Sequence, residues 1–332
     1  MKIAFYDTRP YDMLCFDPLL KEADMEPQYI ENRLSCDTVG YAHEAEAICM
    51  FVNDVCDKAV VDRLAEMNIH LILLRCAGFN NVDLKACAKK DITVMRVPAY
   101  SPSSVAEYAA ALLLSVNRKI PKAYTRIRDF NFNIDGLIGW DMAGKTAGII
   151  GTGKIGQKAI QIFRGFGMNV IAYDLYPNKD LDVEYVSLPE MYARADVISL
   201  HCPLTPETKY IIDRGAIKRM KKNVYLINTS RGELIETTAL IDGINSGRIG
   251  GVGLDVYEGE ADYFYENWSD KIMKDRDLAR LITFPNVIIT SHMAYLTSDA
   301  LKQIAEVTIE NAEAFMKGQL NGNVVAESDI HA

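Results

Sequence analysis

Two histidines stand directly after short apolar runs of the sequence, at places where a side chain could do chemistry. His201 closes the run DVISLH and His292 closes the run VIITSH. Imidazole changes its charge near neutral pH, so it is the usual proton donor when a carbonyl gains a hydride. We expect His292 to be this donor, because His201 begins a loop (His-Cys-Pro) suited to contact with a cofactor. The remaining histidines are expected to be structural or solvated: His43, His70 and His331.

An arginine and a glutamate occupy comparable places after two other apolar runs. Arg231 follows VYLI within INTSRG, and Glu260 follows GVGL within LDVYEGE. A guanidinium binds a carboxylate through parallel hydrogen bonds, and a carboxylate can hold an imidazole in place. With His292 these groups make a complete set for reducing a 2-oxo acid, although each taken singly is more often an ordinary surface residue.

The glycine-rich segment GTGKIG follows the apolar run TAGII and precedes an apolar helical face. Gly151 permits a tight turn, Gly153 lets the backbone approach a pyrophosphate, and Gly156 permits close packing of helix on strand. The N-terminus of that helix would offer N–H groups and a positive dipole to the phosphates. The segment therefore predicts a dinucleotide-binding loop.

An aspartate strengthens this prediction. Asp174 closes the next apolar run, NVIAYD, at the spacing of about 20 residues at which a carboxylate binds the adenosine ribose hydroxyls. A 2′-phosphate would meet a like charge there, so we expect NAD rather than NADP. The alternative is a glycine-rich turn followed by an ordinary surface aspartate.

Two series of buried strands would position these side chains. Runs rich in aliphatic and β-branched residues alternate with helical stretches, which is typical of doubly wound parallel α/β sheets. The first series comprises residues 3–6, 47–52, 71–74 and 93–97. The second comprises residues 146–150, 170–173, 197–200, 224–227, 252–254 and 287–290.

The boundary between the two series is expected near residues 98–102, where AYSPSS interrupts the pattern. Ser104, followed three residues later by Glu107, resembles a capping box and predicts a helix over 104–117. Apolar residues at helical spacing predict a last helix that ends near Gly318.

The composition is that of an ordinary globular protein. The chain has 332 residues, of which 49% are hydrophobic and 24% charged, and its formal net charge is −9. The dispersed acidic residues argue against nucleic-acid and membrane partners, and the sequence offers neither a signal peptide nor a run of about 20 apolar residues. We therefore expect a cytoplasmic protein. Seven cysteines without a CxxC pair indicate free thiols and no metal site.

Several of these segments, in this order, resemble the D-isomer-specific 2-hydroxyacid dehydrogenase family. The resemblance rests on RCAGFNNVD, RVPAYSPSSVAEYA, KTAGIIGTGKIG, DVISLHCPLTPET, NTSRGELI, LDVYEGE and SHMAY, and runs from Met1 to about Asn323. It implies NAD as the cofactor and the reversible reduction of pyruvate to D-lactate, with His292 as the proton donor. We also expect a homo-oligomer with a dimer as its building unit.

The resemblance further implies two doubly wound domains that flank a cleft. Residues 1–100 plus 298–332 would form a flavodoxin-like substrate domain, and residues 101–297 a Rossmann cofactor domain inserted in it. The segment 261–284, rich in aromatic and charged residues, resembles an insertion of the lactate-type enzymes.

Family positions can be carried over residue by residue. The catalytic arginine, glutamate and histidine fall on Arg231, Glu260 and His292. The positions that would contact NAD are Gly151, Gly153, Ile155, Gly156, Asp174, Cys202, Pro203, Thr208, Thr229, Ser230 and Asp255. Those on the substrate side are Arg75, the backbone of Ala77 and Gly78, Tyr100 and Tyr295, with Phe79 beside them.

Two alternatives stay open. One is a related dehydrogenase for a larger 2-oxo acid, such as 2-oxoisocaproate or phenylpyruvate. The other is a nucleotide-sensing binding module of the corepressor type, since a fold does not dictate a function. The intact arginine, glutamate and histidine set argues against the second alternative.

Overall fold

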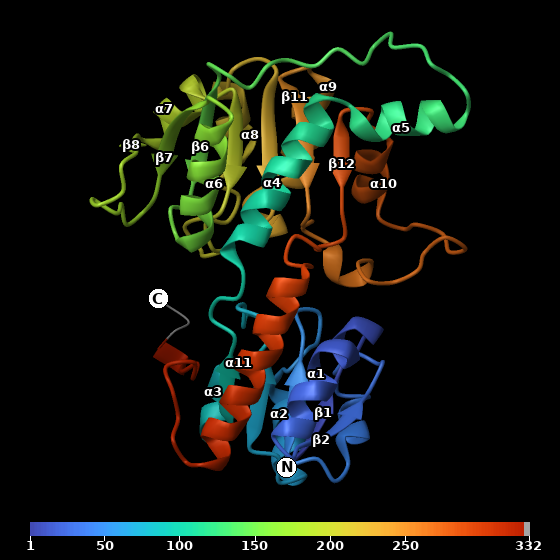
Figure 1. Cartoon of the computed structure of the whole chain (residues 1–332), viewed down its shortest axis with the longest axis vertical. Helices are drawn as coiled ribbons and strands as arrows, with labels where there is room; N and C mark the ends of the chain where they lie inside the picture. The colour runs from blue at the N-terminus through green and yellow to red at the C-terminus, as the bar shows by residue number, and fades with distance from the viewer. Residues whose placement is uncertain (329–332) are drawn as a thin grey trace. The chain divides into compact units, whose positions relative to one another are not determined.

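The computed structural model describes residues 1–328, which divide into two compact units (Figure 1). Unit 1 contains Met1–Ser101 and the chain from Leu296 onward, and unit 2 is Pro102–Tyr295. Each unit is built around its own parallel sheet, with helices on both faces. This confirms the predicted fold class of two doubly wound α/β units.

Unit 1 has a five-stranded parallel sheet in the order β2-β1-β3-β4-β5, the order of flavodoxin-like folds. The central strands β3 and β4 are buried throughout, because helices cover both faces. The strands are β1 (Lys2–Phe5), β2 (Glu26–Tyr29), β3 (Ala47–Met50), β4 (Leu71–Leu74) and β5 (Thr93–Arg96). The helices are α1 (Pro10–Glu22), η1 (Val39–Ala42), α2 (Lys58–Glu66), α3 (Leu84–Lys89) and α11 (Ser298–Met316).

The last helix, α11, returns to unit 1 after the whole of unit 2 has been built. It packs against α1 and against strands β4 and β5. Asn311 Nδ2 donates to the Arg96 carbonyl at 3.0 Å, which joins the helix to the end of β5. Gly318 follows the helix with φ +64°, a conformation that favours glycine, so the predicted stop is confirmed.

Unit 2 has a seven-stranded parallel sheet in the order β12-β11-β10-β9-β6-β7-β8. The strand order reverses between β6 and β9, which is where open α/β sheets bind ligands. The strands are β6 (Thr146–Ile150), β7 (Asn169–Tyr173), β8 (Glu184–Tyr185), β9 (Val197–Leu200), β10 (Val224–Asn228), β11 (Ile249–Leu254) and β12 (Val287–Ile289). The helices are α4 (Pro102–Asn117), α5 (Ile120–Arg128), α6 (Lys154–Gly165), α7 (Leu188–Arg194), α8 (Arg214–Arg219), η2 (Gly232–Leu234), α9 (Thr237–Asn245), η3 (Glu260–Asp262) and α10 (Arg276–Thr283).

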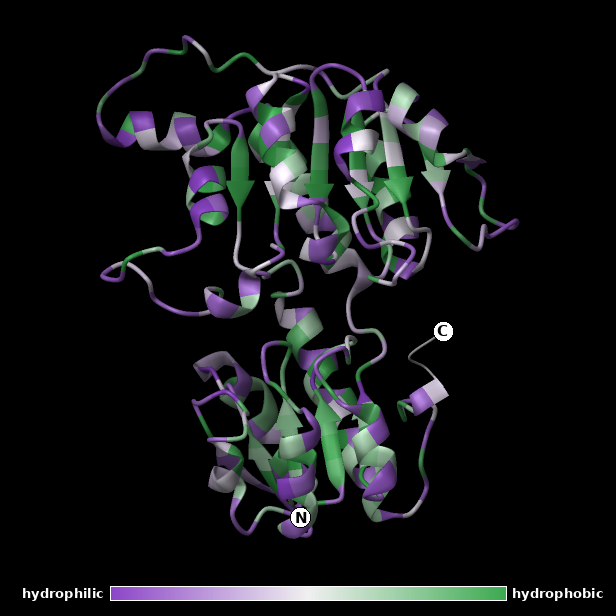
Figure 2. Cartoon of the chain, turned by 180° about the vertical axis from the view of Figure 1, so that it is seen from behind, coloured by the Kyte–Doolittle hydropathy of each residue, from purple (hydrophilic) through white to green (hydrophobic). Residues whose placement is uncertain are grey.

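Two apolar cores hold this second sheet, one on each face. Helices α4 and α6 cover one core, which includes Leu113 and Phe163, and α7 to α10 cover the other, which includes Met191 and Leu281. Figure 2 shows the inner strands of both units as mainly hydrophobic segments. Side chains of the inner strands are thus buried on both faces, so the polar groups that could meet a ligand lie in the loops that follow the strands.

All ten predicted strands form, and two edge strands were not predicted. β2 has the polar sequence EPQY, with a proline that is tolerated at a sheet edge, and β8 has only two residues. The helix predicted from Ser104 begins earlier, at Pro102, because proline fits the first turn of a helix. Ser104 therefore lies inside the helix, and the proposed capping box was wrong.

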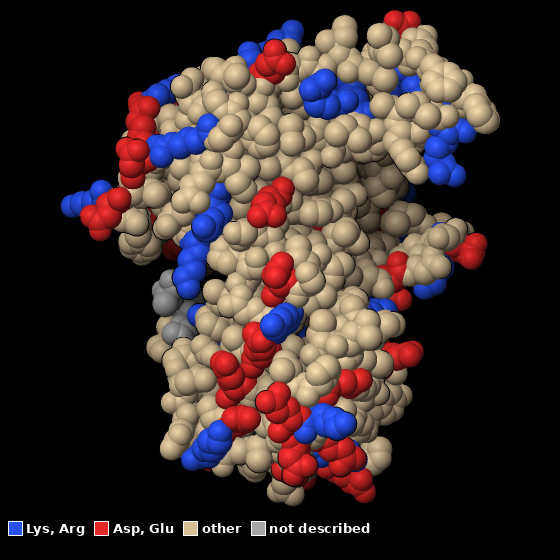
Figure 3. Space-filling model, viewed as in Figure 1, with Lys and Arg blue, Asp and Glu red and all other residues tan. Residues whose placement is uncertain are grey.

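Acidic and basic side chains are interspersed on the face drawn in Figure 3. Among residues 1–328, no helix combines the length and the apolar character that crossing a bilayer would require. All seven cysteines are free, and Cys15 and Cys36 are the two that are not buried. His331 lies outside the described residues.

Candidate active site

Three of the predicted catalytic residues follow three neighbouring strands of unit 2. Arg231 follows β10, Glu260 follows β11 and His292 follows β12, and these strands are adjacent and parallel. The carboxyl ends of parallel strands lie along one edge of a sheet, so the fold brings the three segments to the same edge.

Glu260 and His292 are in direct contact. Glu260 Oε1 lies 2.7 Å from His292 Nδ1, and Glu260 Oε2 accepts a hydrogen bond from the Tyr257 N–H at 2.9 Å. The two side chains are only 18% and 16% exposed, so the pair is largely sheltered from water. With Nδ1 engaged by the carboxylate, Nε2 is the nitrogen that can exchange a proton with a bound molecule.

The backbone at His292 is held in an unusual conformation. Its φ is +51°, a region that costs a residue with a Cβ about 1 kcal/mol or more. Two hydrogen bonds offset this cost: the His292 N–H donates to the Asp255 carbonyl at 2.7 Å, and the Tyr265 hydroxyl donates to the His292 carbonyl at 2.7 Å. The backbone that carries the imidazole is therefore fixed on both sides of the Cα atom of His292.

Asp255 fixes the rest of this loop. Its carboxylate is fully buried and accepts from the Thr290 hydroxyl at 2.6 Å, the Met293 N–H at 2.9 Å and the Ala294 N–H at 2.7 Å. Burial raises the pKa of Asp255, and these hydrogen bonds act in the opposite direction. The predicted contact of this residue with the cofactor stays a prediction, and its evident contacts are with the loop that carries His292.

Arg231 lies on a segment that contacts the segment leading to Glu260. A Cβ atom added at Gly232 would lie 2.1 Å from the Tyr257 carbonyl carbon and 2.4 Å from the Glu258 nitrogen, so only glycine fits there. Asn228 Nδ2 donates to the Arg231 carbonyl at 2.8 Å, and Arg231 Nη1 donates to the Ser230 carbonyl at 2.7 Å. Arg231 as a whole residue is partly exposed.

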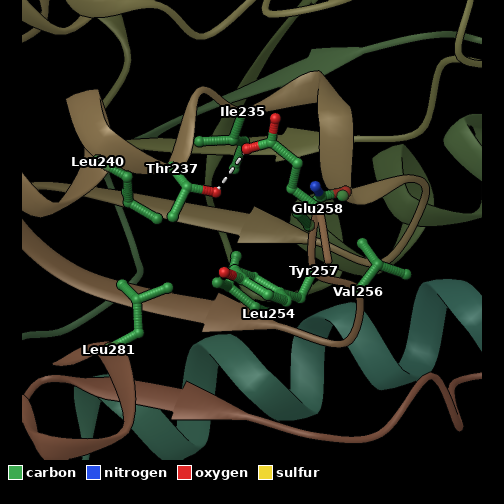
Figure 4. Close-up of a pocket in the computed structure, with 10 residues that line it drawn as sticks. Ile235, Thr237, Leu240, Leu254, Val256, Tyr257, Glu258 and Leu281 are labelled. Carbon is green, nitrogen blue, oxygen red and sulfur yellow. Dashed lines mark hydrogen bonds between the residues drawn. The ribbon is translucent and has the colours of Figure 1, made fainter. Parts of the chain in front are cut away.

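A small cavity lies behind this contact (Figure 4). It is lined mainly by apolar side chains, among them Ile235, Leu254 and Leu281. Thr237 Oγ1 donates to Glu258 Oε2 at 2.8 Å on its upper side in the figure. The segments that carry Arg231 and Glu260 thus rest on the hydrophobic core of the unit.

The glycine-rich loop has the geometry of a phosphate cradle. Gly151 has φ +95°, and a Cβ there would lie 2.5 Å from the Cys202 nitrogen, so the loops after β6 and β9 touch at the point where the strand order reverses. A Cβ at Gly156 would lie 2.0 Å from the Gly151 carbonyl oxygen. Around Gly153 the space is open, with no atom within 4 Å of an added Cβ. Helix α6 starts directly after it, with Ile155 in its first turn.

Asp174 follows β7 beside this loop. Its Oδ2 accepts from the Thr152 N–H at 2.6 Å and the Thr152 hydroxyl at 2.8 Å, and its Oδ1 accepts from the Tyr176 N–H at 2.9 Å. Asp174 is partly exposed. A carboxylate that contacts the glycine-rich loop through Thr152 is suited to bind the ribose of a dinucleotide whose phosphates lie over the glycines.

The other predicted cofactor residues lie on the loops after β9 and β10. The Ser230 hydroxyl donates to the Cys202 carbonyl at 2.6 Å, and the Thr208 hydroxyl donates to the Pro203 carbonyl at 2.7 Å, so the two loops are organised by their own side chains. The Thr229 hydroxyl is buried and has no hydrogen-bond partner among residues 1–328. A buried hydroxyl without a partner is costly unless a ligand pairs with it, so the residues present fit a dinucleotide.

His201 is unsuited to donate a proton at neutral pH. Burial lowers the pKa of His201 to about 4, and its Nε2 lies 2.9 Å from the Ser199 hydroxyl. The other described histidines, His43 and His70, are exposed on unit 1. These positions support the choice of His292.

The predicted substrate residues Arg75, Ala77, Gly78 and Tyr100 belong to unit 1, and Tyr295 is the last residue of unit 2. Hydrogen bonds fix the loop after β4: Arg96 Nη1 donates to the Ala77 carbonyl at 3.1 Å, and the Cys76 thiol donates to the Gly78 carbonyl at 3.2 Å. Ala77, Gly78 and Tyr100 are partly exposed, whereas Tyr295 is buried. Their contact with a substrate stays a prediction.

Arg75 is buried inside unit 1. Its Nη2 donates to the Asp7 carbonyl at 2.8 Å, its Nε lies 3.5 Å from Asp12 Oδ1, and its guanidinium stacks on the Phe51 ring. Burial raises the pKa of Asp54 nearby to about 6, although the charge of Arg75 and two backbone hydrogen bonds lower it in part. Arg75 therefore organises the loops of unit 1 from within.

The chain is similar to known proteins along almost its whole length. Residues 110–294 match the sequence model of the "D-isomer specific 2-hydroxyacid dehydrogenase, NAD binding domain", so NAD is the dinucleotide of unit 2. The chain is 46% identical over 330 residues to "2-hydroxyacid dehydrogenase homolog 2" of Schizosaccharomyces pombe, covering 98% of this chain and 99% of that protein.

It is also 44% identical over 322 residues to the D-lactate dehydrogenase of Escherichia coli, covering 96% of this chain and 98% of that protein. A solved structure described as the pyruvate reductase of Chlamydomonas reinhardtii superposes with a TM-score of 0.92 at 40% identity, covering 97% of this chain and 98% of that one. The chain therefore belongs to the D-isomer-specific 2-hydroxyacid dehydrogenase family.

Proposed function

We propose that this protein is an NAD-dependent D-lactate dehydrogenase, which reduces pyruvate to D-lactate reversibly. The observation that carries the proposal is the 2.7 Å contact between Glu260 and His292 at the strand ends that also carry Arg231. The names of the relatives from Escherichia coli and Chlamydomonas reinhardtii point to pyruvate as the substrate. The handedness of the product rests on family membership.

Each of the three side chains has a role in the proposed reaction. When bound, the nicotinamide supplies the hydride that C2 of pyruvate accepts. Arg231 binds the carboxylate and polarises the carbonyl, because its planar fork can reach two oxygens at once. His292 gives its Nε2 proton to the carbonyl oxygen, and Glu260 stabilises the imidazolium before the transfer. In the oxidation of D-lactate, neutral His292 takes the hydroxyl proton back.

We also propose that residues 1–100 with 298–332 form the substrate domain and residues 101–297 the cofactor domain. The backbone of Ala77 and Gly78 would donate to the substrate carboxylate, with Tyr100, Tyr295 and Phe79 near its side chain. The loop after β4 is held by hydrogen bonds to its carbonyls, which orients its N–H groups. Arg75 would support this loop from beneath.

The second candidate is a dehydrogenase for a larger 2-oxo acid. The relative from Schizosaccharomyces pombe, at 46% identity, carries only the general name of a 2-hydroxyacid dehydrogenase. Rates of NADH oxidation with pyruvate, 2-oxoisocaproate and phenylpyruvate decide between the two. We expect the highest kcat/KM with pyruvate, and a higher value with either larger acid would transfer the assignment to it.

We propose further that two copies of the chain associate through an apolar arm, defined here as residues 120–138. Helix α5 has no buried residue, and the arm exposes Ile120, Tyr124, Ile127, Phe130, Phe132, Ile134 and Ile138. Phe130 and Ile138 are 85% and 87% exposed. An apolar patch of this extent marks an interface, and a two-fold dimer would let each arm cover the other copy.

A further inference from the structure

The carboxylate of Asp174 is fixed by three hydrogen bonds from within its own unit. Oδ2 takes two hydrogen bonds from a single residue, through the backbone and the hydroxyl of Thr152, whereas Oδ1 takes one from the Tyr176 N–H. Thr152 is only 4% exposed, so its hydrogen bonds are sheltered from competing water. Oδ1 retains lone pairs for the ribose hydroxyls.

The Thr152 hydroxyl is itself held from behind. The Tyr185 hydroxyl donates to Thr152 Oγ1 at 2.9 Å, and the Asn178 N–H donates to the Tyr185 oxygen at 3.1 Å. The direction of this chain is fixed at both ends, because an N–H can only donate and an ionised carboxylate can only accept. Every proton in the chain therefore points toward Asp174.

The short edge strand β8 places Tyr185 in this chain. Tyr185 pairs with Ala172, two residues before Asp174, and the Val186 N–H donates to the Ala172 carbonyl at 2.9 Å. Arg194 on α7 forms a double hydrogen bond with Glu184, at 2.7 and 2.8 Å, which fastens the other residue of the strand. This strand of two residues is thus anchored from both sides.

We infer that Thr152 and Tyr185 are positioning residues that prevent Asp174 from turning away, and so set the preference for NAD over its 2′-phosphorylated form. A carboxylate that is free to rotate could leave room for a 2′-phosphate. A fixed carboxylate keeps its negative charge where the 2′-phosphate would have to lie, and so repels it. The inference rests on the placement of the adenosine ribose at Asp174. It is independent of which 2-oxo acid the enzyme reduces.

The test compares binding of NADH and NADPH by fluorescence titration, with no oxo acid present. Thr152→Val deletes the hydroxyl but keeps the backbone N–H, and should lower the ratio of the NADPH Kd to the NADH Kd about five- to tenfold. Tyr185→Phe should lower it about threefold. Because Tyr185 acts through Thr152, the double variant should match Thr152→Val within about twofold.

Three controls separate positioning from general stability. Tyr192→Phe removes a hydroxyl that donates to the Ile211 carbonyl at 2.7 Å in the same unit, and should leave the ratio unchanged. Thr152→Ser keeps the hydroxyl and should keep the ratio, even if Thr152→Val folds poorly. Asp174→Ser should remove most of the discrimination between NADH and NADPH. If this variant keeps the parent ratio, the ribose is not bound at Asp174 and the inference is overturned.

Competition by 5′-AMP and 2′,5′-ADP repeats the measurement on the adenosine half alone. The same loss of discrimination is expected with these probes. If Tyr185→Phe and every folded Thr152 variant keep the parent ratio while Asp174→Ser loses it, Thr152 and Tyr185 only stabilise the sheet edge and the inference fails.

Discussion

Glu260 Oε1 lies 2.7 Å from Nδ1 of His292, although 32 residues separate them in the sequence. The contact exists because β11 and β12 are parallel neighbours whose carboxyl ends lie together. It fixes which imidazole nitrogen faces the carboxylate and which is left for a substrate. Substitutions at this edge of the sheet should therefore separate proton transfer from cofactor binding.

Glu260→Gln should lower kcat/KM for pyruvate about 10-fold or more while the Kd of NADH stays within about twofold. Glutamine keeps the size of the side chain but removes the charge that faces Nδ1 of His292 at 2.7 Å, so the imidazole is held less well during proton transfer. Steady-state rates with pyruvate and fluorescence titration with NADH measure the two quantities. A variant with the kcat/KM of the parent would mean that Glu260 is only a structural acid.

Arg231→Lys should lose pyruvate turnover while keeping the cofactor. A lysine offers a point charge in place of a fork, so kcat/KM for pyruvate should fall about 100-fold or more. The Kd of NADH, from fluorescence titration, should stay within about twofold. A variant with parent-like kcat/KM would show that another group anchors the carboxylate.

His201 should make unit 2 less stable as the pH falls. Its folded pKa of about 4 lies below the ordinary value of 6.5, so the unfolded chain binds more protons between these values. The contribution of neutral His201 to the free energy of unfolding is complete above pH 6.5. It is lost as the pH falls toward 4, and the loss amounts to about 1–3 kcal/mol.

Both tryptophans of the chain, Trp140 and Trp268, lie in unit 2, so their fluorescence during urea unfolding reports on that unit. His201→Gln should flatten the fall of unfolding free energy between pH 6.5 and 4 relative to the parent. His70→Gln, at an exposed position of unit 1, should not. Identical slopes for the parent and His201→Gln would refute the assignment of the shift.

Substitutions that introduce charged residues into the apolar arm should dissociate the dimer into single chains. Ile134 and Ile138 are 78% and 87% exposed, so Ile134→Asp with Ile138→Asp should leave the fold intact and reduce the mass in solution to that of one chain. Leu14→Asp is the matched control, because Leu14 is equally exposed at 78% but belongs to unit 1. Light scattering after size exclusion gives the masses. A parent that is already a monomer, or a double variant that stays associated, would contradict the proposed arm interface.

The sequence was sufficient for those parts of the fold that depend on local pattern. Apolar runs predicted the inner strands because these are buried on both faces. Strand-end reasoning proposed Glu260 and His292, which the structure brings into contact. The edge strands β2 and β8 left no such pattern, since an edge strand can be short and polar. Tyr185 could therefore not be found from periodicity.

Other contacts depend on long-range packing. Arg75 reaches Asp7 across 68 residues, and Tyr265 reaches the His292 carbonyl across 27, through a segment predicted only as an insertion. Every residue has a backbone carbonyl, so the sequence does not mark the position that accepts such a hydrogen bond. Thr152 is different, because it lies between the first two glycines of the phosphate loop. Its position in the motif is a signal from which a hydrogen bond to Asp174 can be predicted.

The most direct test of the proposed mechanism is a comparison of the parent enzyme with His292→Gln, in NADH oxidation with pyruvate and with the lactate product resolved by handedness. The parent should form D-lactate, one molecule for each NADH consumed. His292→Gln should lose at least about 1,000-fold in kcat/KM at every pH, because no other group replaces its proton, while the Kd of NADH stays within about twofold. A variant that retains a tenth or more of the parent activity, or a parent that forms L-lactate, would contradict the account.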